Sequence, residues 1–334
     1  MQQEIELAVI IVNYNSNEVL ENCLQSIFKA ELPFKYEILI IDNASEKSPD
    51  YIINKYPDVL LIENDKNVGF AAANNIGISK SEGKYILLLN PDTIINENSL
   101  LPMINYLDGH KDVGIVGCKI FLLNGEIERS THSFPTLLKE FVHANEFIKQ
   151  IFGYGTFLGK ALARLFNFKS LESYWPHDSI REVDHVTGAC MMVKREAINK
   201  VGLLDEAFFL YNEEVEWSYR MKLAGLKSVY LPKPNIIHLF GHSTGQKVQK
   251  QVVNKLLLER YRGMFYFFQK HSSKTKLFLF KLIVFEGFSL RLIVSYFKSF
   301  FTSRAKRFVY ASERQYIQEI IKLIRLNEYD WRRN

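Results

Sequence analysis

The stretch Ala8-Val9-Ile10-Ile11-Val12, which runs directly into Asn13-Tyr14-Asn15, decides the fold class of this 334-residue chain. Five consecutive apolar residues, four of them β-branched, favour a strand that is buried on both faces. The following sequence adds an amphipathic helical pattern and three similar apolar runs, at residues 19–29, 38–41, 59–62 and 85–89. This alternation predicts an α/β fold with a mixed, mostly parallel sheet flanked by helices.

Polar residues follow three of the predicted strands. Asn13 follows the first strand, Asp42 and Asn43 follow the second, and Asn90 and Asp92 follow the run 85–89. Open α/β sheets bind their ligands beyond the carboxyl ends of the strands. The sequence therefore predicts a ligand site at this edge of the sheet.

The composition allows a full α/β core and a smaller part beside it, because 47% of the residues are apolar. The charge is distributed unevenly along the chain. After Thr244 there are 19 Lys and Arg against 6 Asp and Glu, a net charge of +13, and the part before that point carries −8. A basic segment of this size predicts an anionic partner, such as acidic lipid, nucleic acid or a phosphorylated substrate.

The three cysteines, Cys23, Cys118 and Cys190, are far apart and lie in or beside apolar runs. Their number and spacing favour neither a disulfide framework nor a zinc cluster, and a reducing, cytosolic setting is expected. The acidic start of the chain leads directly into a strand, unlike a signal peptide, so export is not expected.

Asp92 follows four apolar residues, an asparagine and a proline, at the point where a strand is expected to end. Its carboxylate would project from the sheet edge, where a metal-bound diphosphate would lie, and Mg²⁺ or Mn²⁺ commonly takes one or two carboxylates there. The alternative is a simple turn in which Asp92 caps the next helix.

A second group of acidic residues lies in Tyr211-Asn212-Glu213-Glu214-Val215-Glu216-Trp217, before the helical pattern 218–224. Glu213 and Glu216 share one face of a helix, and Glu214 points elsewhere. One interpretation is a general base that takes a proton from an acceptor hydroxyl. The other is that the carboxylates stabilise the start of a helix through its dipole.

Two further motifs accompany these carboxylates. His238 ends a short predicted strand at 230–237 and is either a metal ligand or a structural histidine. The segment 67–77 predicts a glycine turn that leads into a helix of small residues, a geometry that lets backbone amides approach phosphate. It lacks the spacing of dinucleotide-binding and P-loop motifs, which disfavours those enzyme classes.

In their order and spacing, these motifs resemble glycosyltransferase family 2, whose members have the GT-A fold. The resemblance covers residues 5–243 and rests on the segments 9–15, 40–45, 67–77, 88–93, 187–190 and 209–217. Within the family, the sequence is most similar to bacterial rhamnosyltransferase-type enzymes of cell-surface polysaccharide synthesis, whose usual donor is dTDP-L-rhamnose. The resemblance implies an inverting transfer from a nucleotide-diphosphate sugar.

The resemblance implies roles for individual residues of the donor site. Val12, Asn13 and Tyr14 would lie near the nucleotide base, and Asp42 and Asn43 would lie at the base and ribose. The other matching positions are Asn67, Gly69, Asn75, Asn90 and Asp92 on the donor side, and Gly188 and Trp217 on the acceptor or sugar side.

The same resemblance implies a divalent cation, Mg²⁺ or Mn²⁺, bound by Asp92 and His238. Asp92 stands at the last carboxylate of the family's D-x-D motif, but Asn90 replaces the first, so the site has one anionic ligand fewer. In the family's Glu-Asp motif the second acid is the base. That position is Glu214 here, with Glu213 as the fallback.

Four alternatives to this function stay open. A transferase of the same fold could use a UDP-hexose donor. A sugar nucleotidyltransferase also places a nucleotide on such a sheet, but residues 13–16 are not the glycine-rich, basic loop of those enzymes. An inactive sugar-nucleotide-binding subunit is disfavoured by the presence of Asp92, Glu213 and Glu214. A nucleic-acid-binding protein could use the basic carboxyl-terminal part, but that part has long apolar runs and no recognisable binding module, so nucleic acid is not the expected partner.

The predicted organisation is a GT-A domain at 1–244, with a nucleotide-binding half at 1–93 and a variable, aromatic-rich insertion at 129–181 on the acceptor side. A basic helical extension follows at 245–334. Its nearly continuous apolar segment, 277–301, is interrupted by charges every five to seven residues, which suits an interfacial helix or a packed helical hairpin.

The expected partners follow from these features. They are a nucleotide-diphosphate sugar, a glycan or polyprenyl-diphosphate-linked acceptor, and either an anionic membrane surface or a second copy of the chain in a homo-oligomer. The expected location is peripheral, on the cytoplasmic face of the cell membrane.

Overall fold

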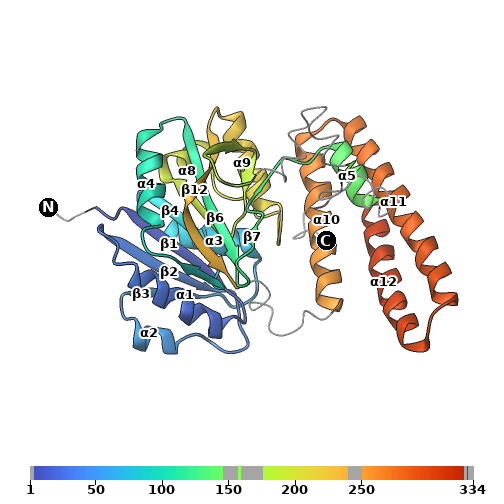
Figure 1. Ribbon diagram of the computed structural model, residues 1–334, viewed down its shortest axis with the longest axis horizontal. Coiled ribbons are helices and arrows are strands. Elements are labelled where there is room, and N and C mark those ends of the chain that lie inside the picture. The colour runs from blue at the N-terminus through green and yellow to red at the C-terminus, as the bar shows by residue number, and fades with distance from the viewer. Residues whose placement is uncertain (1–3, 146–156, 159–175, 240–249, 327–328, 330–334) are drawn as a thin grey trace. The chain divides into compact units, whose positions relative to one another are not determined.

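The protein is represented by a computed structural model that describes residues 4–145, 157–158, 176–239, 250–326 and 329 (Figure 1). The chain forms two compact units. Unit 1 comprises Met1–His132, Trp175–Glu206 and Glu213–Val248. Unit 2 comprises Ser133–Tyr174, Ala207–Asn212 and Gln249–Asn334. The predicted boundary after residue 244 falls close to the boundary at Val248, whereas Ser133–Tyr174, which we expected in the GT-A domain, groups with unit 2.

Unit 1 is built on one large sheet that, among the described residues, contains ten strands. The main path runs β3 (Val59–Glu63), β2 (Tyr36–Asp42), β1 (Leu7–Asn13), β4 (Tyr85–Leu89), β11 (Cys190–Lys194), β6 (Val113–Leu122), β12 (Lys227–His238) and β5 (Thr93–Ile95). In addition, β7 (Ile127–Glu128) pairs with β6 and β9 (Arg181–Val183) pairs with β12, while β8 (Thr131–His132) and β10 (His185–Val186) form a separate pair.

The strand directions confirm the mixed, mostly parallel sheet. β3, β2, β1 and β4 are parallel neighbours, and β6 and β12 are parallel as well. The central β11 is antiparallel to both β4 and β6, so β6 runs in the same direction as β4. The carboxyl ends of β1, β2, β4, β6 and β12 therefore meet at one edge of the sheet.

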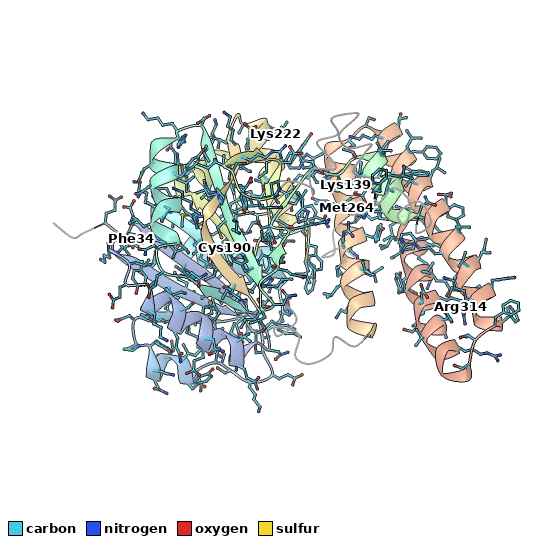
Figure 2. All side chains as sticks on the ribbon, in the orientation of Figure 1. Phe34, Lys139, Cys190, Lys222, Met264 and Arg314 are labelled. Carbon is cyan, nitrogen blue, oxygen red and sulfur yellow. The ribbon has the colours of Figure 1, made fainter. Side chains whose placement is uncertain are left out.

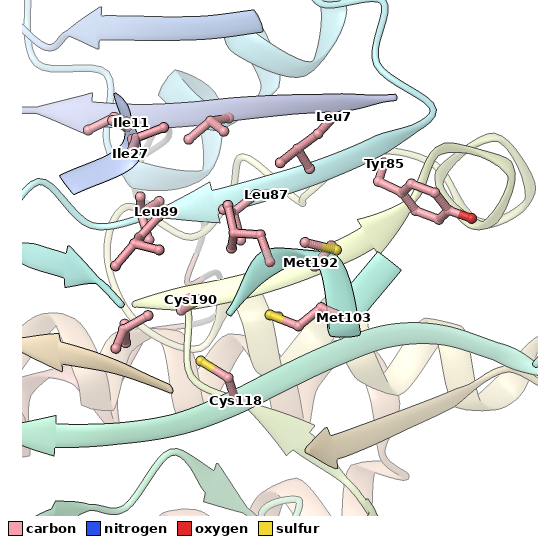
Figure 3. Packing of buried hydrophobic residues seen from close by; sticks show 14 of the residues in the cluster. Leu7, Ile11, Ile27, Tyr85, Leu87, Leu89, Met103, Cys118, Cys190 and Met192 are labelled. Atoms are coloured by element: carbon pink, nitrogen blue, oxygen red, sulfur yellow. The ribbon is translucent and has the colours of Figure 1, made fainter. Parts of the chain in front are cut away.

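Helices cover both faces of the sheet, as Figure 1 shows. They are α1 (Asn17–Lys29), α2 (Tyr51–Lys55), α3 (Phe70–Lys80), α4 (Leu100–Gly109), α8 (Arg195–Val201) and α9 (Glu213–Leu223). Successive residues of β1 face opposite sides: Ile11 packs in the cluster that includes α1 and α4 (Figure 3), and Ile10 packs in the cluster that includes α3, α8 and α9. This two-sided burial explains why β1 is an uninterrupted apolar run.

Glycine permits two close backbone arrangements in α3. Gly69 begins this helix with φ +87°, a conformation that disfavours other residues. A Cβ atom on Gly77 would lie 2.5 Å from Cγ2 of Ile10, so only glycine lets α3 approach β1 this closely. The predicted glycine turn and small-residue helix are both present.

β12 is longer than predicted and contains a bulge. Lys227–Leu231 pairs with the first half of β6, and Asn235–His238 pairs with the second half. Leu231 lies opposite Cys118 and Asn235 lies opposite Lys119, so residues 232–234 have no counterpart on β6. Two of these three residues are prolines, which cannot donate to a strand ladder.

Unit 2 is helical. It contains α5 (Leu137–Ala144), α10 (Lys250–His271), α11 (Lys274–Phe300) and α12 (Arg304–Leu323), which confirms the predicted carboxyl-terminal helical extension. The helices share a core of aromatic and aliphatic residues: Phe265, Phe268, Phe280, Val284, Phe288, Ile317, Ile320 and Leu323. None of the helices described by the structure is both long enough and apolar enough to cross a membrane.

Much of the predicted insertion at 129–181 lies outside the described residues. This applies to Phe147, Phe152, Tyr154, Phe166 and Phe168, on which the aromatic-rich helical prediction depended. The described part contains α5, whose first turn is capped by Thr136 through a hydrogen bond from the backbone N–H of Lys139 to its hydroxyl.

Candidate functional site

The carboxyl edge of the sheet gathers the polar residues that the sequence singled out. Asn13 ends β1, Asp42 ends β2, Asp92 follows β4, and His238 ends β12. All four side chains are buried. Parallel strands force these ends together, so positions that are 225 residues apart in sequence become parts of one edge.

Asn13 and Asp42 form the polar centre of the first half of this edge. The amide of Asn13 donates a hydrogen bond of 2.7 Å to Oδ1 of Asp42. The Asp42 carboxylate also accepts from the Ser45 hydroxyl at 2.7 Å and from the Ser45 backbone N–H at 2.9 Å. Among the described residues, the buried Oδ1 of Asn13 has no hydrogen-bond partner. A buried acceptor left open in this way fits a donor group of a bound ligand.

Asn43 and Asn67 hold the turn that starts α3. The Asn43 amide donates to Oδ1 of Asn67 at 2.8 Å, and its carbonyl accepts from the backbone N–H of Val68 at 3.0 Å. Oδ1 of Asn67 also accepts from the backbone N–H of Gly69 at 3.0 Å. Through these bonds Asn43, Asn67 and Gly69 fix the conformation of the loop before α3, where we expect the nucleotide-sugar donor to bind.

Asp92 and His238 lie in direct contact, as their predicted common role requires. Nε2 of His238 is 3.1 Å from Oδ1 of Asp92, and Nδ1 of His238 is 2.7 Å from Oε2 of Glu128. Register explains the contact, because His238 pairs with Thr93, the residue after Asp92. Burial lowers the pKa of His238, but the hydrogen bonds to Asp92 and Glu128 outweigh it and raise the pKa to about 9.

Asp92 lies at the expected edge of the sheet but is only 2% exposed, because β12 lies alongside. The alternative in which Asp92 caps a helix is wrong, since the next element is strand β5 and α4 begins only at Leu100. Asn90 contributes its backbone, which accepts from the Thr93 hydroxyl and donates to the Ala189 carbonyl.

The donor atoms present fit a divalent cation in part. Within the described ranges, no group of three or more His, Cys, Asp and Glu side chains forms a complete metal site. Asp92, in the turn between β4 and β5, and His238, at the end of β12, nevertheless offer one oxygen and one nitrogen, a set that suits Mn²⁺ or Mg²⁺ when substrate phosphates and water supply the remaining ligands. Glu128 adds the carboxylate partner that metal-binding histidines usually have.

The three acidic residues at the start of α9 differ in their surroundings. Glu213 is buried, and burial together with the neighbouring Glu214 carboxylate raises its pKa well above the usual range. Glu214 is partly exposed. Glu216 is fully buried and accepts two hydrogen bonds from Nε of Arg220, at 2.8 and 3.0 Å. The predicted separation is confirmed, since Glu213 and Glu216 face inward.

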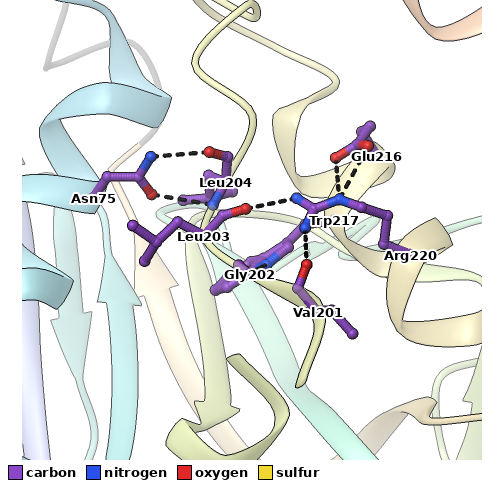
Figure 4. Close-up of polar contacts among 8 residues, drawn as sticks. All are labelled: Asn75, Val201, Gly202, Leu203, Leu204, Glu216, Trp217 and Arg220. Atoms are coloured by element: carbon purple, nitrogen blue, oxygen red, sulfur yellow. Dashed lines mark hydrogen bonds and ion pairs between the residues drawn. The ribbon is translucent and has the colours of Figure 1, made fainter. Parts of the chain in front are cut away.

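The loop that precedes this helix is held by a network around Arg220 (Figure 4). Arg220 donates through one terminal nitrogen to the carbonyl of Val201 at 2.5 Å and through the other to the carbonyl of Leu203 at 2.7 Å. The indole N–H of Trp217 donates to the Gly202 carbonyl at 2.9 Å. With Glu216 anchoring the guanidinium, residues 201–203 are fastened to α9.

Asn75 and Trp217 both hydrogen-bond to the backbone of the segment 202–204. Both amide atoms of Asn75 bond the backbone of Leu204, at 2.9 and 3.1 Å, and its amide nitrogen also reaches Glu206. Trp217 is fully buried in the core beneath the sheet. These contacts leave neither side chain free for direct contact with a substrate, so each would stabilise the segments that it joins.

Three further predicted residues occupy varied positions. Val12 is nearly buried and packs in the core, whereas the ring of Tyr14 is about half exposed beside it. Gly188 has space around its Cα, because a Cβ there would meet only the ring of Phe70, at 3.6 Å. Tyr14 and Gly188 are thus accessible to a ligand in a way that Val12 is not.

Sequence reasoning missed Glu128 entirely. The residue lies in β7, a strand of two residues, and no motif marks it. It reaches His238 only because β7 folds back antiparallel onto β6, which in turn pairs with β12.

Comparison with known proteins agrees with this geometry. Residues 8–202 match glycosyl transferase family 2. N-acetylglucosaminyl-diphospho-decaprenol L-rhamnosyltransferase of Mycobacterium tuberculosis is 28% identical over 266 residues, covering 72% of this chain and 78% of that protein. Rhamnosyltransferase WbbL of Escherichia coli is 25% identical over 244 residues, covering 70% of this chain and 83% of that protein.

Solved structures share the fold. The mannosyltransferase of Pyrobaculum calidifontis, solved with GDP-mannose and Mn²⁺, superimposes with a TM-score of 0.55 at 13% identity, over 98% of this chain and 89% of that one.

The family match spans more than half of the present sequence and ends at Gly202, so it includes the strand ends that carry Asn13, Asp42 and Asp92. The chain belongs to glycosyltransferase family 2 and has the GT-A fold.

Proposed function

We propose that this glycosyltransferase transfers L-rhamnose from dTDP-L-rhamnose to a hydroxyl of a glycan or of a polyprenyl-diphosphate-linked acceptor, in cell-surface polysaccharide synthesis. The observation that carries the catalytic part is the contact between Asp92 and His238 at the carboxyl edge of the sheet. The choice of sugar is supported by the two relatives named as rhamnosyltransferases.

The first half of the edge would bind the nucleotide. The open acceptor Oδ1 of Asn13 suits a base N–H, and the fixed Asp42 carboxylate suits the 3′-hydroxyl of the deoxyribose. Tyr14 is exposed enough to stack on a base. Each contact uses a group that the strand ends already hold in place, so little ordering would be needed on binding.

Asp92 and His238 would hold a divalent cation, Mg²⁺ or Mn²⁺. When bound, the cation supplies positive charge that stabilises the departing nucleoside diphosphate. With the Asn90 side chain in place of a carboxylate, the protein contributes one negative charge fewer, and the nucleotide phosphates would provide more of the binding. We therefore expect cation binding to be much tighter in the presence of the nucleotide.

Glu214 would act as the general base. A base must be ionised at working pH, and Glu213 is poorly suited because its pKa is raised by burial and by Glu214. Glu214 would take the proton from the acceptor hydroxyl while the acceptor oxygen attacks the anomeric carbon. The bond to the diphosphate breaks on the opposite side, so one displacement inverts the configuration.

The test is donor turnover by purified protein, with a panel of nucleotide sugars that includes dTDP-L-rhamnose and UDP-hexoses, in the presence of Mn²⁺ or Mg²⁺. Asp92→Ala and Glu214→Gln should each lower turnover by about 10²–10⁴-fold. The exposed Glu196→Gln is the matched control. Near wild-type rates in both variants would refute the assignment, and a loss confined to Glu213→Gln would move the base to Glu213.

A further inference from the structure

α11 carries a broad apolar surface that the described helices of unit 2 leave uncovered. Its buried residues, among them Phe280, Val284 and Phe288, line one side of the helix and face the core. The opposite side is also apolar. We name it the α11 outer face, and it consists of these exposed residues: Phe278, Leu279, Leu282, Phe285, Leu290, Ile293, Val294, Tyr296, Phe297, Phe300 and Phe301.

These residues form one apolar strip, which the exposed Glu286 interrupts near its middle. Phe278, Leu282, Phe285, Ile293 and Phe300 follow one another at helical intervals. At 1.5 Å per residue, the strip is about 33 Å long. An apolar strip of this length on a helix whose other side already packs in a core marks a binding surface rather than scattered exposure.

The strip is most exposed where α11 turns into α12. Phe297, Phe300 and Phe301 are 66%, 75% and 79% exposed, and α12 begins directly afterwards with Ser303 as its cap. The last turn of α11 and the residue after it thus present three aromatic rings at the tip of a helical hairpin. Phenylalanine rings at such a tip can enter the boundary between lipid headgroups and acyl chains.

The charges around the outer face are positive except for that of the exposed Glu286. Lys274 and Lys276 lie exposed at its amino-terminal end, and Lys298 and Arg307 lie exposed near the hairpin tip. The acidic residue of α11, Glu286, accepts a hydrogen bond of 2.9 Å from Asn145, the residue after α5. Arg314, labelled in Figure 2, lies over the ring of Tyr296 at 4.5 Å and adds a further cation beside the face.

We propose that the α11 outer face docks on an anionic lipid bilayer, with Phe297, Phe300 and Phe301 inserted at the headgroup level and the flanking lysines and arginines bound to lipid phosphates. This inference rests on the proposed function in one respect: a polyprenyl-linked acceptor would lie in the bilayer and would explain why the protein docks there. Apolar insertion and cationic attraction act together at such an interface.

Charge distinguishes the bilayer from two other occupants. A second copy docked by the same face would bring two strongly basic segments, each with a net charge of +13 from residue 245 onward, against each other. A nucleic acid would meet the cations and could stack on the aromatic rings, but it would leave the exposed leucine, isoleucine and valine side chains of the face in contact with water. Anionic lipid complements both the charge and the apolar strip.

Vesicle sedimentation tests the proposal on the full chain. Vesicles of phosphatidylcholine with phosphatidylglycerol should pellet the protein, and vesicles of phosphatidylcholine alone should bind it much more weakly. Added salt should reduce binding to the anionic vesicles without abolishing it, because salt screens the cationic attraction but not the apolar insertion.

A double variant distinguishes vesicle binding through the hairpin tip from nonspecific binding through any exposed apolar residue. Phe300→Ser with Phe301→Ser should lower vesicle partitioning by about tenfold or more. The matched control is Leu123→Ser with Leu223→Ser, which removes two similarly exposed leucines of unit 1 and should bind as wild type does. Circular dichroism of both variants confirms that they are folded.

A local probe reports insertion directly. Tryptophan introduced by Phe300→Trp should shift its emission to the blue on anionic vesicles and be quenched by brominated acyl chains, relative to the native tryptophans of wild type. Leu223→Trp should show neither change.

Three results would overturn the proposal: no binding of wild type to anionic vesicles, equal binding of the tip variant, or no quenching at position 300. If wild type is a dimer that does not bind vesicles, and the tip variant is a monomer, the face binds a second copy of the chain instead. Donor turnover without lipid is the independent readout: intact turnover without vesicle binding refutes only the docking surface, and the converse refutes only the proposed function.

Discussion

Nδ1 of His238 lies 2.7 Å from a carboxylate oxygen of Glu128, and this contact fixes the ring so that Nε2 points at Asp92. The pKa of His238 is raised to about 9, so a cation would bind Nε2 in place of a proton, while Nδ1–H would still donate to Glu128. Glu128 is therefore a positioning residue for the proposed metal site.

Replacing Glu128 should weaken metal binding. Glu128→Ala should lower the affinity for Mn²⁺ of the protein saturated with dTDP by about 10–100-fold, and Glu128→Gln, which can still accept the hydrogen bond, should lower it less. Titration followed by electron paramagnetic resonance of free Mn²⁺ measures both. Glu126→Gln, an exposed position on the same hairpin, is the control. Equal affinities for Glu128→Ala and wild type would contradict the role.

Asp42 should be needed for nucleotide binding. Asp42→Asn removes the charge that its partners Asn13 and Ser45 orient, and should weaken dTDP binding by about 10–100-fold, the usual cost of a lost hydrogen bond to a charged group. Calorimetric titration with dTDP measures this. The control is Asp50→Asn, which makes the same chemical change at an exposed position and should bind dTDP as wild type does. If both variants bind alike, Asp42 does not contact the nucleotide.

Arg220 should matter far more for stability than a lysine two residues away. Arg220→Ala leaves the buried Glu216 carboxylate without its partner and should cost about 3–5 kcal/mol in the free energy of unfolding. Lys222→Ala breaks an exposed pair with Asp184 and should cost about 0–1 kcal/mol. Urea unfolding of both variants checks the contrast, and similar losses would show that the network around Arg220 contributes little.

Glu213 should make stability depend on pH. Its folded-state pKa is raised above the ordinary 4.5, so above pH 4.5 the unfolded chain releases this proton before the folded chain does. The wild type therefore loses stability as pH rises through this window, and Glu213→Gln does not. The melting temperature of the variant minus that of wild type should increase with pH from 4.5 upward. Glu196→Gln is the control, and a parallel trend there would contradict the assignment.

The parts of the fold that could be predicted are those with strong local patterns. β1 and β4 are continuous apolar runs because helices cover both faces of the sheet, and Asn13, Asp42 and Asp92 were found because they end such runs. The spacing of Glu213 and Glu216 also predicts that they share one face of the helix, and the structure shows that this face is the buried one.

What could not be predicted depends on contacts between distant segments. Glu128 meets His238 through a two-residue strand that has no signal of its own. Asn75 bonds Leu204 across 129 positions, so its burial could not be seen in the helix that carries it. One missed contact did have a local signal: Glu216 and Arg220 are four residues apart on a helix, a spacing typical of an ion pair.

The three-residue bulge of β12 has a consequence for sequence change. Residues 235–238 alternate between the two faces of the sheet, and the length of the 232–234 segment sets which of them faces Asp92. Inserting one residue there would bring Ile237 to the position of His238, and deleting one would bring Leu239 there. Either change reverses the parity of the strand and turns His238 away from Asp92. The count of residues between Leu231 and Asn235 is therefore as much a part of the proposed metal site as the histidine itself.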